Sequence, residues 1–329
     1  MNYPKQILIE STSRCNLHCK GCLVGTTPPQ DMEWGLMEQI IKDNNGRSTI
    51  IPYMYSEPTL YPRIYGTAQL SIDSGARFYI ATNGMMWRQD LFELMTEENG
   101  AYQIIFSVDS IYPEKQKICR PGSNLDAILY NIERFAALRN SKGHNIDIAI
   151  KLIERGQDFA EIENFVTYWL SHRYVDYVAV GRMLNAKTEK GMRHTNCLYP
   201  NGLYICITVN GDIVPCMYNL EGYKSRVLGN IRDMTIEEAY NSPMFWKWRQ
   251  DQNFKEPCET CGFAYTGSGM TGTMKFQLFD HTKMSAEKKK LGELHIKTDY
   301  YNTFFSRANK ETEGAMSEWG NRNAHMETD

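Results

Sequence analysis

The stretch Cys15-Asn16-Leu17-His18-Cys19-Lys20-Gly21-Cys22 places three cysteines at the spacing C-x3-C-x2-C, shortly after the apolar run Ile7-Leu8-Ile9. In a loop that leaves a strand, this spacing lets three thiolates surround one inorganic centre, and thiolate is the usual ligand of iron–sulfur clusters. Three ligands for four irons leave one iron with an open coordination position, which is where chemistry takes place. The alternative is a zinc site in which His18 or a distant residue is the fourth ligand.

The composition of the 329-residue chain is that of a globular protein, with 42% hydrophobic residues and a net charge of −3. This length suffices for one large domain and a small one. The weak negative charge provides no basic surface for nucleic acid, which also disfavours a tRNA substrate. No apolar run approaches the roughly 18 residues of a membrane span and the N-terminus does not resemble a signal peptide, so we expect a cytoplasmic protein. In that reducing compartment, nine cysteines favour metal binding or catalysis over disulfides.

Short apolar segments alternate with segments of helical periodicity over residues 5–180. This alternation predicts βαβ units and a parallel sheet. The count of predicted strands falls short of the eight of a closed barrel, and in such folds functional residues collect at the carboxyl ends of the strands. The predicted strands span residues 5–10, 49–55, 77–81, 102–108, 146–153 and 175–180.

The cysteine spacing and its place after the first strand resemble the signature of the radical S-adenosylmethionine (radical SAM) superfamily. The resemblance implies an α/β fold, a (βα)6 partial TIM barrel, and a [4Fe–4S] cluster bound by Cys15, Cys19 and Cys22. It also implies that S-adenosyl-L-methionine chelates the fourth iron and is cleaved by an electron from the cluster to a 5′-deoxyadenosyl radical, which abstracts a hydrogen atom from substrate. The position before the third cysteine is often aromatic in this family and packs near the adenine. Here it is Gly21, so the adenine wall must come from elsewhere.

Polar residues follow the second and third predicted strands. Tyr55-Ser56-Glu57-Pro58 resembles the family's G-G-E-P segment, which hydrogen-bonds the amino group of the methionine moiety, although Tyr and Ser replace the two glycines. Thr82-Asn83-Gly84 also has a parallel in the family. The resemblance therefore implies cofactor contacts for Ser56, Glu57 and Asn83, whereas the alternative for Asn-Gly is an ordinary turn.

The end of the fourth predicted strand carries a second polar set. Ser107 and Asp109 match a family position that contacts the ribose and carboxylate of the cofactor. Arg120, in the following loop, could pair with that carboxylate through a bidentate fork. Ser and Asp could instead cap a helix. Lys151, within the fifth strand, and Arg182, beyond the sixth, could face the barrel lumen and bind substrate; the alternative is a solvated face or a structural pair.

A second cysteine set lies after residue 190. Asn210-Gly211 between two apolar runs predicts a β-hairpin, and Cys258-Glu259-Thr260-Cys261 suits one metal centre. The order of Cys197, Gly211, Cys216 and that later pair resembles the SPASM/twitch extension of radical SAM enzymes. The resemblance implies an auxiliary [4Fe–4S] cluster on Cys197, Cys216, Cys258 and Cys261, with no open position and a role in electron transfer or structure. Residues 262–273 contain no further cysteine, which predicts the shorter twitch version; zinc is the alternative.

Two cysteines remain outside both sets. Cys206 lies between Ile205 and Ile207 in a predicted hairpin strand, and we expect it in the core. Cys119 lies beside Arg120 in the loop after the fourth strand, on the predicted active face. A thiol there could return a hydrogen atom to a substrate radical, as in radical epimerases; the alternative is an ordinary loop thiol.

The sequence therefore predicts a radical SAM partial barrel at 1–184, a twitch domain at 190–270 and a partly disordered C-terminal extension at 271–329. The predicted enzyme is a dehydrogenase-like oxidoreductase for a small molecule, with the auxiliary cluster as electron acceptor and a reductant such as flavodoxin or ferredoxin. The alternatives are a redox-neutral epimerase or cyclase and a peptide-modifying maturase. Cys15 lies close to the N-terminus, which speaks against a preceding peptide-recognition domain. A zinc-stabilised binding module is the alternative that is not an enzyme.

Overall fold

A computed structural model of the chain describes residues 3–22, 24, 28–144, 146–182, 204–217, 227–250 and 277–280. Three cysteines of the predicted auxiliary site, Cys197, Cys258 and Cys261, lie outside the described residues. So do the predicted boundary near residues 184–190 and most of the C-terminal extension. The limits of the three predicted parts therefore stay a prediction.

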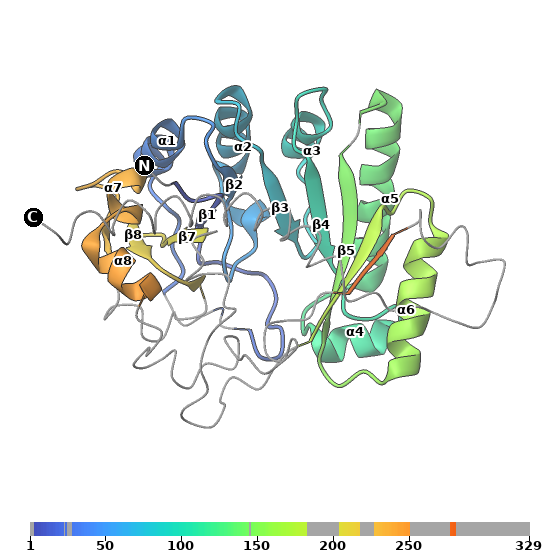
Figure 1. The fold of residues 1–329 in the computed structure, drawn as a ribbon. Coiled ribbons are helices and arrows are strands. Elements are labelled where there is room, and N and C mark those ends of the chain that lie inside the picture. The colour runs from blue at the N-terminus through green and yellow to red at the C-terminus, as the bar shows by residue number, and fades with distance from the viewer. Residues whose placement is uncertain are drawn as a thin grey trace, which may run out of the picture.

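Six parallel strands form the wall of a partial barrel (Figure 1). β1 pairs with β2, and β3 to β6 pair in chain order. A single parallel bridge between Ile50 and Phe78 joins the two groups, and the Ile50 amide donates to the Arg77 carbonyl at 2.8 Å. The predicted α/β partial barrel is thus confirmed. The strands are β1 (Gln6–Ile9), β2 (Thr49–Ile51), β3 (Tyr79–Thr82), β4 (Gln103–Ser107), β5 (Asp147–Glu154) and β6 (Tyr177–Arg182).

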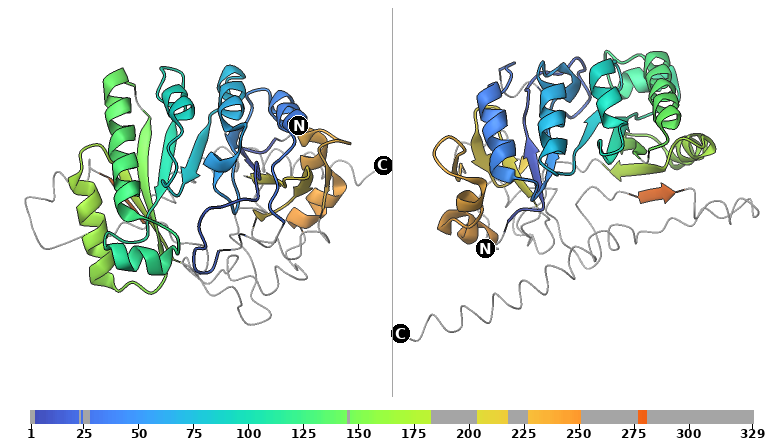
Figure 2. Two further views of the ribbon diagram at one scale, coloured as in Figure 1. Left: turned by 180° about the vertical axis from the view of Figure 1, so that it is seen from behind. Right: turned by 90° about the horizontal axis from the view of Figure 1, so that it is seen from above.

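Helices connect the strands and cover one face of them, which Figure 2 shows from above. Strand residues alternate between the two faces, as the pleat requires. Ile7 and Ile9 belong to the large core beneath the helices, whereas Leu8 packs on the opposite, concave face. The helices are α1 (Trp34–Asn44), α2 (Ile64–Asp73), α3 (Gln89–Met95), α4 (Pro113–Cys119), α5 (Leu125–Lys142) and α6 (Phe159–Ser171), with the short 3-10 helix η1 (Pro58–Leu60) after β2.

The predicted hairpin exists, and it extends the barrel sheet. β7 (Tyr204–Ile207) runs parallel to β1, and β8 (Asp212–Val214) returns antiparallel to β7, with β9 (Gly229–Asn230) beside β8. Gly211 adopts a φ of +87° in the turn, a conformation that favours glycine. Cys206 is fully buried between Leu8 and Val214, which confirms its predicted place in the core. Helices α7 (Ile236–Tyr240) and α8 (Pro243–Gln250) follow.

The structure corrects two predicted positions. Cys119 is the last residue of α4 and not part of a loop, because Pro113 starts a helix at its first position. Arg182 is the last residue of β6 and not beyond it. The outer edge of β6 is covered by β10 (Gln277–Asp280), which pairs with it antiparallel. Among the described residues, no helix combines the length and apolar character needed to cross a membrane.

Candidate active site

The cysteine loop, residues 15–22, leaves the carboxyl end of β1. Cys15, Cys19 and Cys22 are each half-buried, and Leu17 between them is buried in the protein. The Leu17 amide donates to the Cys15 Sγ at 3.4 Å. Burial and, to a lesser extent, the nearby acidic groups of Glu57, Cys19 and Cys22 raise the pKa of the Cys15 thiol to about 11. As a free thiol Cys15 therefore stays protonated at neutral pH, and it needs a metal to hold it as a thiolate.

This donor set fits an iron–sulfur cluster. Three half-buried thiols come from one loop, and one of them already accepts a backbone N–H bond of the kind that tunes cluster sulfurs. Among the described residues, no three Cys, His, Asp or Glu side chains converge closely enough to hold one metal ion. A cluster binds its three thiolates through three separate irons, so the thiolates need not meet at one point.

The end of α4 and the segment that follows it bind the backbone of the cysteine loop. The Lys20 amide donates to the Cys119 carbonyl and the His18 amide to the Pro121 carbonyl, each at 3.1 Å. Gly122 adopts a φ of +92°, and a Cβ there would stand 3.4 Å from the Leu17 side chain. The loop is thus fixed to the β4–α5 connection through backbone bonds that do not depend on side-chain identity.

Asp109 is the centre of a buried ionic network beside this loop. Its side chain is fully buried and accepts from the Arg120 Nε at 2.9 Å and Nη2 at 3.2 Å. The Arg155 Nε donates to the same carboxylate at 2.9 Å, and the Ile153 amide does so at 2.9 Å. Burial opposes ionisation of Asp109, but the charges of Arg120 and Arg155 outweigh it and keep its pKa below the usual value. Arg120 also points its Nη1 at the Cys19 Sγ, 3.8 Å away.

Glu57 joins the ends of β2 and β3. Its buried carboxylate accepts from the Thr59 amide and hydroxyl, from the Thr82 hydroxyl and from the Asn83 amide, at 2.7–3.1 Å. Burial raises the pKa of Glu57, and these hydrogen bonds oppose the rise. Three of these bonds end on the Oε1 and one on the Oε2, so Glu57 holds the ends of β2 and β3 together, and its predicted contact with the cofactor stays a prediction.

Asn83 and Ser56 lie beside the cysteine loop. The Asn83 Nδ2 donates to the Asn16 Oδ1 at 2.7 Å, which links β3 to the loop. The backbone next to Ser56 is tied to the root of the loop, because the Glu57 amide donates to the Arg14 carbonyl at 2.9 Å. Within the part of the chain that the structure describes, the Ser56 Oγ is buried without a hydrogen-bond partner. A buried hydroxyl of this kind next to the loop fits a bound polar ligand such as the predicted cofactor.

Ser107 and Lys151 stand opposite one another in the register of β4 and β5. Both are half-buried, and their neighbours along each strand belong to the core beneath the helices. Ser107 and Lys151 therefore lie on the opposite face of the sheet. Burial and, to a lesser extent, the charge of Arg120 lower the pKa of the Lys151 ammonium to about 8, while Asp109 opposes the shift. Lys151 is therefore a cation at neutral pH and becomes neutral in mildly alkaline solution.

We expect Lys151→Met to stabilise the protein at pH 7 by about 2 kcal/mol. A folded-state pKa below that of the unfolded chain means that the fold disfavours the ammonium, and this penalty disappears as pH rises through about 8 toward the ordinary lysine value. The advantage of the variant should therefore shrink between pH 8 and 10. Urea unfolding of both proteins across this range measures it, and a difference that stays constant with pH would contradict the expectation.

The remaining predicted residues are placed as follows. Cys119 is buried, and its Sγ accepts from the Gln157 Nε2 at 3.6 Å. Cys216 follows β8 and is half-buried. Only the backbone of Arg182 is described, and it pairs with Glu154 in the β5–β6 register. The structure thus brings together the first three cysteines, Ser56, Glu57, Asn83, Asp109 and Arg120, with Lys151 within electrostatic range of the last two.

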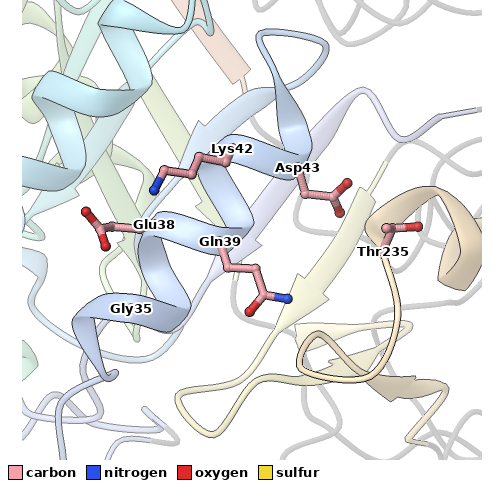
Figure 3. Close-up of a pocket in the computed structure, with 6 residues that line it drawn as sticks. All are labelled: Gly35, Glu38, Gln39, Lys42, Asp43 and Thr235. Carbon is pink, nitrogen blue, oxygen red and sulfur yellow. The ribbon is translucent and has the colours of Figure 1, made fainter.

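A pocket of about 360 Å³ lies elsewhere, between α1 and the turn before α7 (Figure 3). Its lining contains no residue of the cysteine loop or of the Asp109 network. The lining residues are Gly35, Glu38, Gln39, Lys42, Asp43 and Thr235. This hollow on the outer surface is therefore separate from the chemistry of the cysteine loop.

The sequence analysis missed Arg155 and Gln157. Gln157 donates to the Asp109 carbonyl at 2.8 Å as well as to Cys119. Arg155 directly follows β5 and lies two residues beyond the predicted fifth strand, so its place near the carboxyl end of a barrel strand was the available signal.

Comparison with known proteins identifies the family. Residues 9–166 match the model of the radical SAM superfamily, and residues 197–262 match that of SPASM, an iron–sulfur cluster-binding domain. The chain is 23% identical over 312 residues to the tungsten-containing aldehyde ferredoxin oxidoreductase cofactor-modifying protein of Pyrococcus furiosus, covering 78% of this chain and 87% of that protein. It is 22% identical over 327 residues to the AdoMet-dependent heme synthase of Methanosarcina barkeri, covering 82% and 91%.

The fold is similar to that of Streptococcus suis SuiB bound to S-adenosylmethionine, with a TM-score of 0.63 and 15% identity over 79% of this chain and 71% of SuiB. SuiB has also been crystallised with its precursor peptide SuiA. The chain therefore belongs to the radical SAM superfamily, carries a SPASM-type iron–sulfur domain and has [4Fe–4S] clusters and S-adenosyl-L-methionine as its cofactors.

Proposed function

We propose that this enzyme oxidises a small molecule through a substrate radical, which gives its electron to the auxiliary cluster and a proton to a base. When bound, the first cluster and S-adenosyl-L-methionine supply the 5′-deoxyadenosyl radical that abstracts the hydrogen atom. The first electron comes from a reductant such as flavodoxin or ferredoxin. The observation that carries the proposal is the position of Cys216 relative to the cysteine loop.

Cys216 and the cysteine loop lie toward opposite ends of one sheet. The cysteine loop leaves the carboxyl end of β1, whereas the chain turns at Gly211 and runs back along β8 before it reaches Cys216. Leu8, Cys206 and Val214 lie side by side in register along this path. The length of β1 corresponds to about 10 Å at 3.3 Å per residue. A substrate on the concave face would lie between the cysteine loop and Cys216, and this supports transfer of an electron from a substrate radical to the auxiliary cluster.

Residues of this chain are proposed to bind and orient the reactants. Ser56, Ser107 and Arg120 contact the cofactor, and Glu57 and Asn83 hold the strand ends and the loop around it. The Lys151 ammonium holds an anionic group of the substrate below about pH 8, the value to which burial lowers its pKa. Arg182 at the end of β6 is proposed as a second substrate contact.

The names of the curated relatives support a small-molecule substrate. Of the two relatives compared above, one is a cofactor-modifying protein and one a heme synthase, so both names refer to small molecules. The likeness to the peptide-bound SuiB supports the fold alone, because the sequences are 15% identical. A peptide-modifying maturase is therefore the weaker proposal.

A redox-neutral reaction with Cys119 as hydrogen donor is the second candidate. Its support is that the Cys119 carbonyl touches the cysteine loop at Lys20. The thiol is only 6% exposed and accepts from Gln157, which favours a packing role. Cys119→Ala should leave a dehydrogenase unaffected, whereas an epimerase that uses this thiol would still cleave the cofactor but release no epimer.

We expect the reconstituted wild-type protein to hold about eight irons and to release 5′-deoxyadenosine when S-adenosyl-L-methionine and dithionite are added without oxygen. Cys216→Ala should lose about four irons and keep cofactor cleavage, because the first cysteine set is untouched. Cys206→Ala, which removes a buried core thiol, is the matched control and should keep all the iron. About four irons in the wild type would exclude the electron-acceptor role.

A further inference from the structure

Arg155 belongs to none of the motifs described above, yet it is built into the protein next to the cysteine loop. Its side chain is 8% exposed, and its Nε lies 2.9 Å from the Asp109 Oδ2. The same oxygen accepts from the Arg120 Nε at 2.9 Å. A fully buried carboxylate is thus shared by two buried guanidinium groups.

The other ends of the two arginines reach the same loop from two sides. The Arg155 Nη1 donates to the Lys20 carbonyl, next to a cluster ligand. The Arg120 Nη1 lies 3.8 Å from the Cys19 Sγ. Gln157 fixes the turn that carries Arg155 by donating to the Asp109 carbonyl at 2.8 Å.

The charges in this network do not cancel. Two guanidinium groups and one carboxylate leave a net charge of one positive unit, and the surroundings are buried, where charges are poorly screened. Reduction of an iron–sulfur cluster adds negative charge, so a nearby buried cation favours the reduced state. Charge and hydrogen bonds near the sulfurs are among the factors that set cluster potentials.

We infer that Arg155 is a positioning residue that binds the cysteine loop at the Lys20 carbonyl. Arg155 also shares the Asp109 carboxylate with Arg120, and this arrangement keeps the Arg120 guanidinium directed at the Cys19 sulfur. Its charge raises the reduction potential of the first cluster. This inference concerns the cluster and not the oxidation proposed above, so either can fail without the other.

The test is a redox titration of three reconstituted variants, followed on the EPR signal that changes when S-adenosyl-L-methionine is added. Arg155→Gln removes the charge, and Arg155→Lys keeps it. Lys117→Gln is the control, because it removes a cation that is 57% exposed on the neighbouring helix α4. The comparison is made at the applied potential at which the first cluster of the wild type is half reduced. There we expect the ratio of oxidised to reduced cluster to be about tenfold higher in Arg155→Gln, which corresponds to a reduction potential lower by about 59 mV for one electron. Arg155→Lys and Lys117→Gln should stay within about threefold of wild type.

Two results would overturn the inference: a ratio within about threefold of wild type in Arg155→Gln, or equal shifts in Arg155→Gln and Arg155→Lys. If Arg155→Gln takes up no iron at the first site, its unfolding temperature decides. An unchanged unfolding temperature, with iron uptake restored by Arg155→Lys, supports positioning of the loop. Global destabilisation that Arg155→Lys does not restore assigns Arg155 to general stability and overturns the inference.

Discussion

Asp109→Asn should lower the free energy of unfolding by about 3–5 kcal/mol, the largest stability loss that we expect from one substitution outside the apolar core. Asp109 is completely buried and accepts hydrogen bonds from Arg120, Arg155 and the Ile153 amide. Asparagine has nearly the same size, so the variant leaves no cavity. It instead leaves two buried guanidinium groups without their shared anion, which is the costly way to break a buried ion pair.

Anaerobic urea unfolding of the iron-loaded protein measures this loss. Asp90→Asn is the matched control, because Asp90 is 49% exposed and pairs with Arg88 at 3.2 Å on the surface. An exposed pair of this kind contributes at most about 1 kcal/mol. If Asp109→Asn lowers the free energy of unfolding by no more than Asp90→Asn does, water must reach the network, and the description of Asp109 as completely buried would be wrong.

Cys22→Ala should reduce formation of 5′-deoxyadenosine to the level seen without protein and remove about four irons per chain. Two thiols of the loop would remain, and two thiolates leave a [4Fe–4S] cluster with a second unprotected iron. Reductive cleavage of S-adenosyl-L-methionine depends on this cluster, so we expect the variant to form no 5′-deoxyadenosine of its own. Iron and sulfide analysis and chromatographic quantification of 5′-deoxyadenosine measure the two effects independently.

Cys206→Ala is the control that distinguishes the loss of a cluster ligand from the loss of a cysteine elsewhere in the protein. Cys206 is fully buried between Leu8 and Val214, and its substitution removes about one methyl-sized group from the core, at a cost of about 1 kcal/mol. It should keep the iron and the cofactor cleavage of the wild type. If Cys22→Ala keeps about eight irons and cleaves the cofactor, another residue ligates the cluster and the assignment from spacing is wrong.

The barrel and the first metal site could be predicted from sequence because their signals are local. The run Ile7-Leu8-Ile9 and the three cysteines that follow it lie within sixteen residues, and each predicted strand carries its own apolar pattern. Helix α4 lacked such a pattern, since Ile118, one of its few apolar residues, is 67% exposed. Because α4 is short and weakly periodic, neither the helix nor the burial of Cys119 could be predicted from the sequence.

The Asp109 network could not be read from the sequence, because its partners are far apart along the chain. Arg155 is separated from Asp109 by two helices and a strand, and no local pattern indicates that they meet. An isolated arginine after a strand is more often solvated than buried, so residue type alone argued for the surface. For the same reason, the pairing of β7 with β1 became visible only in the structure.

That pairing has a consequence for the order in which the chain can mature. The Glu10 amide, at the root of the cysteine loop, donates to the Ile207 carbonyl, and the Glu10 carboxylate accepts from the Val209 amide. At translation rates of about 5–20 residues per second, β7 leaves the ribosome on the order of 10 to 40 seconds after β1. During that interval β1 has an unpaired edge, which is a template for misassembly. The part of the barrel that takes up iron is therefore completed late, although its cysteines are synthesised long before.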